Sequence, residues 1–257
     1  MQRSAFTLLE LAIAMIILGL LTATVLVGKE LRKGAQIRST IKEVEEINIA
    51  LSNFYEAFQA LPGDMSNASS YWPDNCPTNC DGDDDKIIEA YNEALLSWFH
   101  LTAANLLKGD YSGVGDGDTS THTAHVNAPK STFQAGQYAL LHYHQEHFPD
   151  QHMIILGGPK NTDIGLLAIL DPNSAYNLDS KTDDGLPSSG KTYGRNGWNV
   201  DWDSTNCLID ENGAREANSE TIDKNIEYNM DLNTNECIMG FKLISHIGYD
   251  DSRTETD

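Results

Sequence analysis

An apolar stretch near the start of the chain constrains the fold more than any other feature. Residues 6–28 form a run of 23 residues in which Glu10 is the only ionisable side chain. At about 1.5 Å per residue, a helix of this length spans the roughly 30 Å hydrocarbon core of a bilayer. The run therefore predicts a transmembrane helix. A secretory signal peptide is the alternative, but its apolar region is usually about 7–15 residues long and is followed by an Ala-x-Ala site, which is lacking here.

Charge is distributed unevenly along the chain. The 257 residues carry 17 basic and 38 acidic side chains, a formal net charge of −21. Residues 1–60 hold six of each kind, so the whole acidic excess lies in residues 61–257. Because nucleic-acid binding needs a positive surface, this balance excludes nucleic acid as a partner.

The four cysteines all lie in the acidic part of the chain. They are Cys76, Cys80, Cys207 and Cys237. An even set of cysteines favours structural disulfides and an oxidising compartment, whereas the Cys-x3-Cys spacing leaves a zinc site as the alternative.

Basic residues on both sides of the apolar run leave its orientation undecided by the positive-inside rule. Arg3 precedes the run, and Lys29, Arg32 and Lys33 follow it. The cysteines decide between the two orientations, since four cytosolic thiols would have no structural role. We therefore expect residues 62–257 to form an acidic globular domain outside the cytoplasm.

Placing Glu10 in a membrane is energetically unfavourable. A carboxylate near the bilayer interior costs about 2.5–3.5 kcal/mol on insertion scales unless it finds a partner. No other residue of the apolar run can neutralise it. We therefore expect its partner to come from another molecule, and a free amine made by cutting the chain before Phe6 would have the right charge. Such a pair would set the register of one subunit against the next.

The residues Ala5-Phe6-Thr7-Leu8-Leu9-Glu10 and the apolar run resemble the prepilin-type cleavage and methylation motif of type IV pilins and type II secretion pseudopilins. The resemblance implies a leader of residues 1–5, which prepilin peptidase removes between Ala5 and Phe6 before the new amino terminus is methylated. It also implies that Glu10 guides assembly of a homo-oligomeric filament by the pilus or secretion machinery. Such a precursor lies in the bacterial inner membrane and then enters a periplasmic or extracellular filament.

Further segments resemble a branch of prepilin-like proteins with large C-terminal domains. They are residues 26–65, 97–113 and 170–194. The resemblance implies an α+β, pilin-like fold, in which a long N-terminal helix continues into a globular domain with a small antiparallel sheet.

The helix is predicted to continue past the membrane. No proline occurs between Phe6 and Leu61, so an amphipathic continuation over residues 29–61 is expected until Pro62 stops it. Apolar residues recur there at a mean spacing of 3.5: Ile37, Ile41, Val44, Ile47, Leu51, Phe54 and Phe58. This stripe predicts packing on the chain's own domain, with a short coiled coil as the alternative. The charged residues Arg38, Lys42, Glu43, Glu45 and Glu46 are expected to face water.

An acidic loop predicts a calcium site. Asp81, Asp83 and Asp85 alternate like the first ligands of a calcium-binding loop, Ile87 would supply its carbonyl, and Asn92 stands at the twelfth position. Lys86 replaces the usual turn glycine and Asn92 the usual glutamate, for which Glu89 or Glu93 is a substitute. The alternative is a solvated acidic loop before a helix over residues 86–108.

Four other polar clusters are interpreted as turn or surface features. Two are acidic turns: Asp110, Asp116 and Asp118, and Asp179, Asp183 and Asp184. The third comprises His142, His144, His147 and His152, for which exposed or hydrogen-bonded side chains beside a strand over residues 137–144 are favoured over a metal site. The last, residues 185–192, fits the phosphate-loop expression but lacks the strand before and the helix after that this chemistry requires.

These features predict a structural protein and no enzymatic activity. A pilus or pseudopilus subunit is the first hypothesis, and a calcium-stabilised adhesin or minor tip pilin that binds a surface ligand is the second. A membrane-anchored hydrolase is disfavoured, because the chain has no Gly-x-Ser-x-Gly elbow and no His-Glu-x-x-His sequence. A second strand over residues 153–158 and a short helix capped by Asp171 complete the expected layout.

Overall fold

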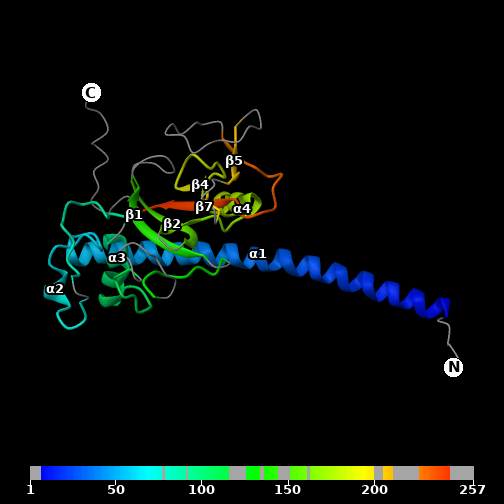
Figure 1. Cartoon of the computed structure of the whole chain (residues 1–257), viewed down its shortest axis with the longest axis horizontal. Coiled ribbons are helices and arrows are strands. Elements are labelled where there is room, and N and C mark those ends of the chain that lie inside the picture. The colour runs from blue at the N-terminus through cyan, green and yellow to red at the C-terminus, as the bar shows by residue number, and fades with distance from the viewer. Residues whose placement is uncertain are drawn as a thin grey trace.

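One helix dominates the computed structural model (Figure 1). The structure describes residues 7–76, 79–90, 92–115, 126–133, 136–143, 151–160, 163–199, 205–210 and 226–243. Helix α1 spans Leu8–Phe58, 51 residues without a break. It ends three residues before the expected Leu61, because Gln59 has a φ of 55° in the left-handed region and its N–H bonds to the carbonyl of Tyr55 at 2.8 Å.

The two halves of α1 have different surroundings. The N-terminal half projects from the domain (Figure 1), and none of its most apolar 18-residue window is buried. This helix is long and apolar enough to cross a membrane. In the C-terminal half, the predicted stripe packs on the domain: Ile37, Val44, Ile47, Leu51 and Phe54 are buried, and Ile41 and Phe58 are partly buried. The stripe therefore packs on the chain's own domain, as predicted, and not in a coiled coil.

Glu43 does not face water, so its predicted place on the charged side of α1 is wrong. Its side chain is half-buried, and its Oε2 accepts hydrogen bonds from Ser131, Thr132 and Tyr138. Glu43 directly precedes Val44 in the buried stripe, so it lies at the edge where the helix meets the sheet. The other four charged residues of the predicted polar face are exposed.

An antiparallel sheet lies beside the C-terminal half of α1 (Figure 1). Its strands are β1 (Gln137–Tyr143), β2 (Gln151–Lys160), β3 (Asp163–Leu167), β4 (Thr192–Asn196) and β7 (Cys237–Lys242). The order is β1-β2-β7-β4, with β3 paired to β2. Two short strands, β5 (Leu208–Ile209) and β6 (Glu227–Tyr228), form a separate pair. Strands β1 and β2 match the two predicted from the sequence, and the layout is the expected α+β arrangement of a long helix with a small antiparallel sheet.

Three short helices cover the ends of the domain. They are α2 (Ala68–Tyr71), α3 (Asn92–Ala103) and α4 (Pro172–Thr182). Helix α3 is shorter than the expected 86–108, because the backbone N–H groups of Lys86, Ile87 and Ile88 bond to side chains outside the helix. Helix α4 begins as predicted, with Pro172 in its first turn and the Asp171 carboxylate accepting the N–H of Ser174 at 3.1 Å.

All four cysteines form disulfides. Cys76 is bonded to Cys80, and Cys207 to Cys237, the first residue of β7. No thiol is free, so the zinc alternative is wrong.

Candidate functional site

The start of α1 carries the residue expected to guide assembly. Thr7 caps the helix, and Glu10 Oε2 accepts hydrogen bonds from both the N–H and the hydroxyl of Thr7 at 2.8 Å. The Thr7 hydroxyl accepts the N–H of Glu10 in return at 3.2 Å, which completes a capping box. Glu10 is therefore hydrogen-bonded within its own helix, a partner that the sequence analysis did not anticipate. Neither donor is a cation, so the negative charge remains uncompensated. Ala5 and Phe6 lie outside the described residues.

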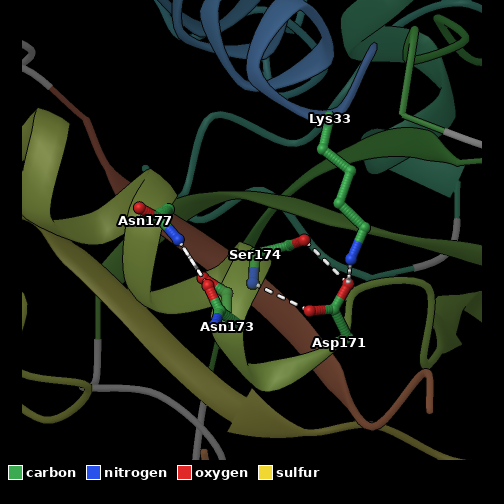
Figure 2. A network of polar contacts seen from close by, with 5 residues as sticks. All are labelled: Lys33, Asp171, Asn173, Ser174 and Asn177. Atoms are coloured by element: carbon green, nitrogen blue, oxygen red, sulfur yellow. Dashed lines mark hydrogen bonds and ion pairs between the residues drawn. The ribbon is translucent and has the colours of Figure 1, made fainter. Parts of the chain in front are cut away.

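A partly buried ion pair fixes α1 against α4, as Figure 2 shows. Lys33 Nζ lies 3.0 Å from Asp171 Oδ2, and the side chain of Asp171 is only 7% exposed. Ser174 donates to both carboxylate oxygens, through its N–H to Oδ1 and through its hydroxyl to Oδ2 at 2.7 Å. The same carboxylate therefore caps α4 and holds the long helix at the end of the domain nearest its free half.

At the end of the domain farthest from the free half of α1, the acidic loop brings carboxyl groups together in two overlapping sets of three. Ligand oxygens of Asp64, Asp83 and Glu93 all lie within 4.8 Å of one another, and those of Asp83, Asp85 and Glu89 do the same. Asp64 and Glu93 are buried, whereas Asp83 is exposed. The three residues come from the turn after α1, the loop and the first turn of α3.

Backbone amides of the loop hold Asp64 and Glu93 in place. Asp64 accepts the N–H groups of Asp85 at 3.1 Å and Lys86 at 3.0 Å. Glu93 accepts the N–H groups of Asp83 at 3.3 Å and Glu89 at 3.2 Å. The loop is thus wrapped around two buried carboxyl groups.

Gly82 and Lys86 of the loop have special backbone geometry. A Cβ on Gly82 would lie 2.4 Å from backbone atoms of Asp64, so only glycine fits this close approach. Lys86 occupies the position where a calcium loop usually has glycine, and its φ of 71° is the left-handed conformation that glycine favours. Lys86 therefore adopts a backbone conformation that glycine would adopt with less strain.

The predicted ligands divide into two groups. Asp83 belongs to both groups of carboxylates and Asp85 to the group with Glu89, whereas Asp81 turns away and accepts hydrogen bonds from the N–H and hydroxyl of Ser69 at 2.7 and 2.8 Å. Asp85 accepts the N–H of Ile87 at 2.8 Å, and Asn92 begins α3. The ligand roles of Ile87 and Asn92 remain predictions.

Sequence analysis missed Asp64 entirely. It named Glu89 and Glu93 only as substitutes for the twelfth ligand, whereas the structure places both in the carboxylate groups. Nothing in the local sequence around Asp64 indicates that the turn after α1 returns to a loop some twenty residues later. The only local signal is an acidic residue directly after the Pro62-Gly63 pair.

Burial makes Asp64 and Glu93 retain protons. It raises the pKa of Asp64 to about 7 and that of Glu93 to about 9, and neighbouring acidic groups add to both shifts. A proton or a bound cation offsets the repulsion between these carboxyl groups. The arrangement supports cation binding in mildly basic solution, when the carboxyl groups lose their protons.

Two buried histidines brace the same loop. His100 Nδ1 accepts the N–H of Gly63 at 2.8 Å, so its Nε2 carries the hydrogen and donates to the carbonyl of Cys80 at 2.8 Å. Burial lowers the pKa of His100 to about 4, so the ring is neutral at physiological pH. His152 Nε2 accepts the N–H of Ile88 at 3.1 Å.

His152 also pairs across the sheet with His142 of β1, their ring centroids being 4.7 Å apart. Both rings are buried, and the hydrogen bond of His152 agrees with the favoured interpretation of exposed or hydrogen-bonded histidines beside a strand. His144 and His147 lie outside the described residues.

The predicted place of Asp179 in an acidic turn is wrong, because Asp179 lies buried in helix α4. Asp179 accepts the hydroxyl of Tyr228 at 2.7 Å and the N–H of Gly185 at 3.2 Å, and Asp184 accepts the N–H of Leu186 at 2.8 Å. Residues 185–192 follow helix α4 and precede strand β4, the reverse of the strand and helix that a phosphate loop needs. The interpretation of this segment as a turn is confirmed. Asp116 and Asp118 lie outside the described residues.

Comparisons of the chain with protein-family models, with curated proteins and with solved structures find no match.

Proposed function

We propose that this chain is a structural subunit of a type IV pilus-like or type II secretion pseudopilus filament. Its precursor is inserted in the bacterial inner membrane through the apolar half of α1, with the acidic domain outside the cytoplasm. Prepilin peptidase cuts between Ala5 and Phe6, and the mature chain joins other copies in a periplasmic or extracellular filament. The function is assembly, and the chain carries out no catalysis.

One observation carries this proposal: a single unbroken helix is buried in its own domain at one end and wholly exposed and apolar at the other. Leu8 is 89% exposed and Val27 61%, whereas Phe54 of the same helix is fully buried. Exposed apolar surface on this scale marks contact with a membrane or with other protein. A rigid apolar rod on a water-soluble domain suits both the membrane-inserted precursor and the core of a helical filament.

In this proposal Thr7 positions Glu10 for assembly. Its N–H and hydroxyl hold the Glu10 carboxylate by two hydrogen bonds before any second copy is present. These bonds reduce the cost of placing Glu10 in the membrane but leave its charge available to the amine of a neighbouring Phe6. In this proposal, assembly adds a charged partner to a carboxylate that Thr7 has already positioned.

Mass spectrometry of assembled material tests the processing step. The first residue is expected to be a methylated Phe6, with residues 1–5 removed. Assembled protein that retains Met1 contradicts this step.

A second candidate function is a calcium-stabilised adhesin or minor tip pilin, and the carboxylate cluster of Asp64, Asp83 and Glu93 favours it. Calcium would stiffen the loop at the end of the domain farthest from the free half of α1, where a tip subunit presents its surface. Electron microscopy with a domain-specific antibody distinguishes the two, because a tip subunit is labelled only at filament ends.

A further inference from the structure

Two basic residues of α1 lie just beyond the end of the domain. Lys29 and Arg32 are exposed, and within the described part of the chain neither forms an ion pair or a side-chain hydrogen bond. The described ion pairs of this helix involve Lys33, which binds Asp171, and Lys42. We call Lys29 and Arg32 the basic turn.

The basic turn continues the side of α1 that holds the domain. Lys29 lies four residues before Lys33, which binds α4, and Arg32 lies four residues before Gln36, whose side-chain amide donates to the carbonyl of Thr132 at 3.1 Å. Residues four apart lie one above the other on the same helix face. The domain-binding face of α1 therefore extends one turn toward the N-terminus, where both side chains are exposed and no residue that the structure describes pairs with them.

The charge of the domain indicates what covers this face. Residues 61–257 hold 11 basic and 32 acidic side chains, so copies packed side by side repel one another. Basic groups between neighbouring domains reduce that repulsion. The basic turn is placed to supply them, because it lies at the edge of the domain on an exposed helix.

We propose that Lys29 and Arg32 dock against the acidic domain of a second copy of this chain. This inference rests on the proposed filament, since it needs copies packed with their helices side by side. Anionic lipid headgroups have the same charge and lie at this depth in the precursor. The second copy is favoured because basic residues are disfavoured on the translocated side of a membrane helix, so an external protein contact gives a reason to keep them there.

Carbodiimide cross-linking tests the contact directly in membranes, because it joins an amine only to a carboxylate that touches it. Full-length wild-type copies from a heavy-isotope culture and from an unlabelled culture are purified, mixed and reconstituted together in lipid vesicles. Lys29 is expected to link to an Asp or Glu of the acidic domain in peptide pairs that combine the two isotopes. Lys42 supplies the internal control, because it lies 3.4 Å from Glu46 of its own chain. A Lys42–Glu46 link without any Lys29 link between copies overturns the proposal.

Paired variants test whether the position of the charge matters. Lys29→Gln with Arg32→Gln is expected to lower the pelletable filament fraction about tenfold and to abolish its dependence on salt, because exposed ion pairs are screened by ions. Arg38→Gln with Lys42→Gln removes the same charge from exposed positions of the same helix and is expected to preserve assembly. Equal losses from both pairs overturn the proposal.

Two further outcomes distinguish failure of this docking proposal from failure of the proposed filament function. If wild-type protein forms no filaments, the proposed function fails, but Lys29 links between copies in the membrane still support docking of the basic turn. If phosphatidylglycerol vesicles bind wild-type protein and not the Lys29→Gln, Arg32→Gln variant, and no links between copies form, the partner is lipid and the proposal is overturned.

Discussion

The hydroxyl of Tyr138 in β1 donates to Glu43 Oε2 in α1 at 2.7 Å and ties the sheet to the long helix. Tyr138 is 1% exposed, and burial raises its pKa well above its usual value, so it remains a neutral donor. The Ser131 hydroxyl and the Thr132 N–H donate to the same oxygen at 3.2 and 3.3 Å. With the Lys33–Asp171 pair, this contact fixes the rotation of α1 relative to the domain.

Replacing Glu43 with Ala should destabilise the domain. The substitution leaves the buried Tyr138 hydroxyl without this acceptor, and the expected loss in the free energy of unfolding is about 1–3 kcal/mol. Urea unfolding of the full chain in detergent measures it. Glu46→Ala is the matched control, because Glu46 is exposed on the same helix and should change the stability by less than about 0.5 kcal/mol. Equal stability of the two variants would show that the Glu43 contact contributes little.

Stability should fall as the pH rises from about 6.5 to 9 without calcium. Burial raises the pKa of Asp64 and Asp179 to about 7 and of Glu93 to about 9, so the folded state holds protons that the unfolded chain, with carboxyl pKa values near 4, has released. These groups contribute stability that is fully present below about pH 4 and is lost progressively as the pH rises to their folded pKa values, so Glu93 accounts for most of the loss above pH 7. His100 acts in the opposite sense, but its contribution changes only between about pH 4 and 6.5.

Thermal melts of the full chain across this pH range measure how stability depends on pH. Asp64→Asn with Glu93→Gln should abolish most of this dependence, because neither amide titrates. Asp179→Asn alone should remove only the smaller part near pH 7. A melting temperature that rises between pH 6.5 and 9 would contradict the burial of these carboxyl groups.

Calcium should raise the melting temperature of the full chain, and more at pH 8 than at pH 6, because protons compete for the same oxygens. Asp83→Asn should remove most of the increase, since Asp83 belongs to both carboxylate groups. Asp81→Asn should retain it, since the Asp81 carboxylate is bonded to Ser69. Thermal melts with and without a chelator measure this increase. An unchanged melting temperature in wild-type protein would contradict calcium binding.

The two disulfides should contribute unequally to stability. In the chain-entropy relation, the Cys207–Cys237 bond, with a sequence separation of 30, contributes about 3–4 kcal/mol, and the Cys76–Cys80 bond, with a separation of 4, about 2 kcal/mol. Paired Cys→Ala variants compared by urea unfolding measure the difference. A larger loss in the free energy of unfolding from removing Cys76–Cys80 would show that this bond stabilises the fold by more than the chain-entropy effect.

Local patterns predicted local structure well. Asp171 and Pro172 marked the start of α4, and the apolar stripe marked the buried side of α1, because capping and helical periodicity depend on residues a few positions apart. Strand β7 and strand β4 were not predicted: each is almost wholly buried, so neither shows the alternation that identifies a strand with one wet face.

Contacts between distant segments could not be predicted in this way. Glu43 was assigned to water because its neighbours on α1 are charged, whereas Tyr138, 95 residues later, makes it an acceptor at an interface. Asp64 joins Asp83 and Glu93 only because the turn after α1 folds back against the loop. Which carboxyl groups of an acidic chain become buried depends on such tertiary contacts.

Electron microscopy of cells expressing wild-type protein or Glu10→Ala tests the filament most directly. Wild-type cells should show filaments, and the variant should remain in the membrane fraction without forming them, because the charge that binds the neighbouring amine is gone. Glu30→Ala, which removes an exposed glutamate of the same helix beyond the apolar run, should assemble normally. Filaments of normal number and length from Glu10→Ala would contradict the account.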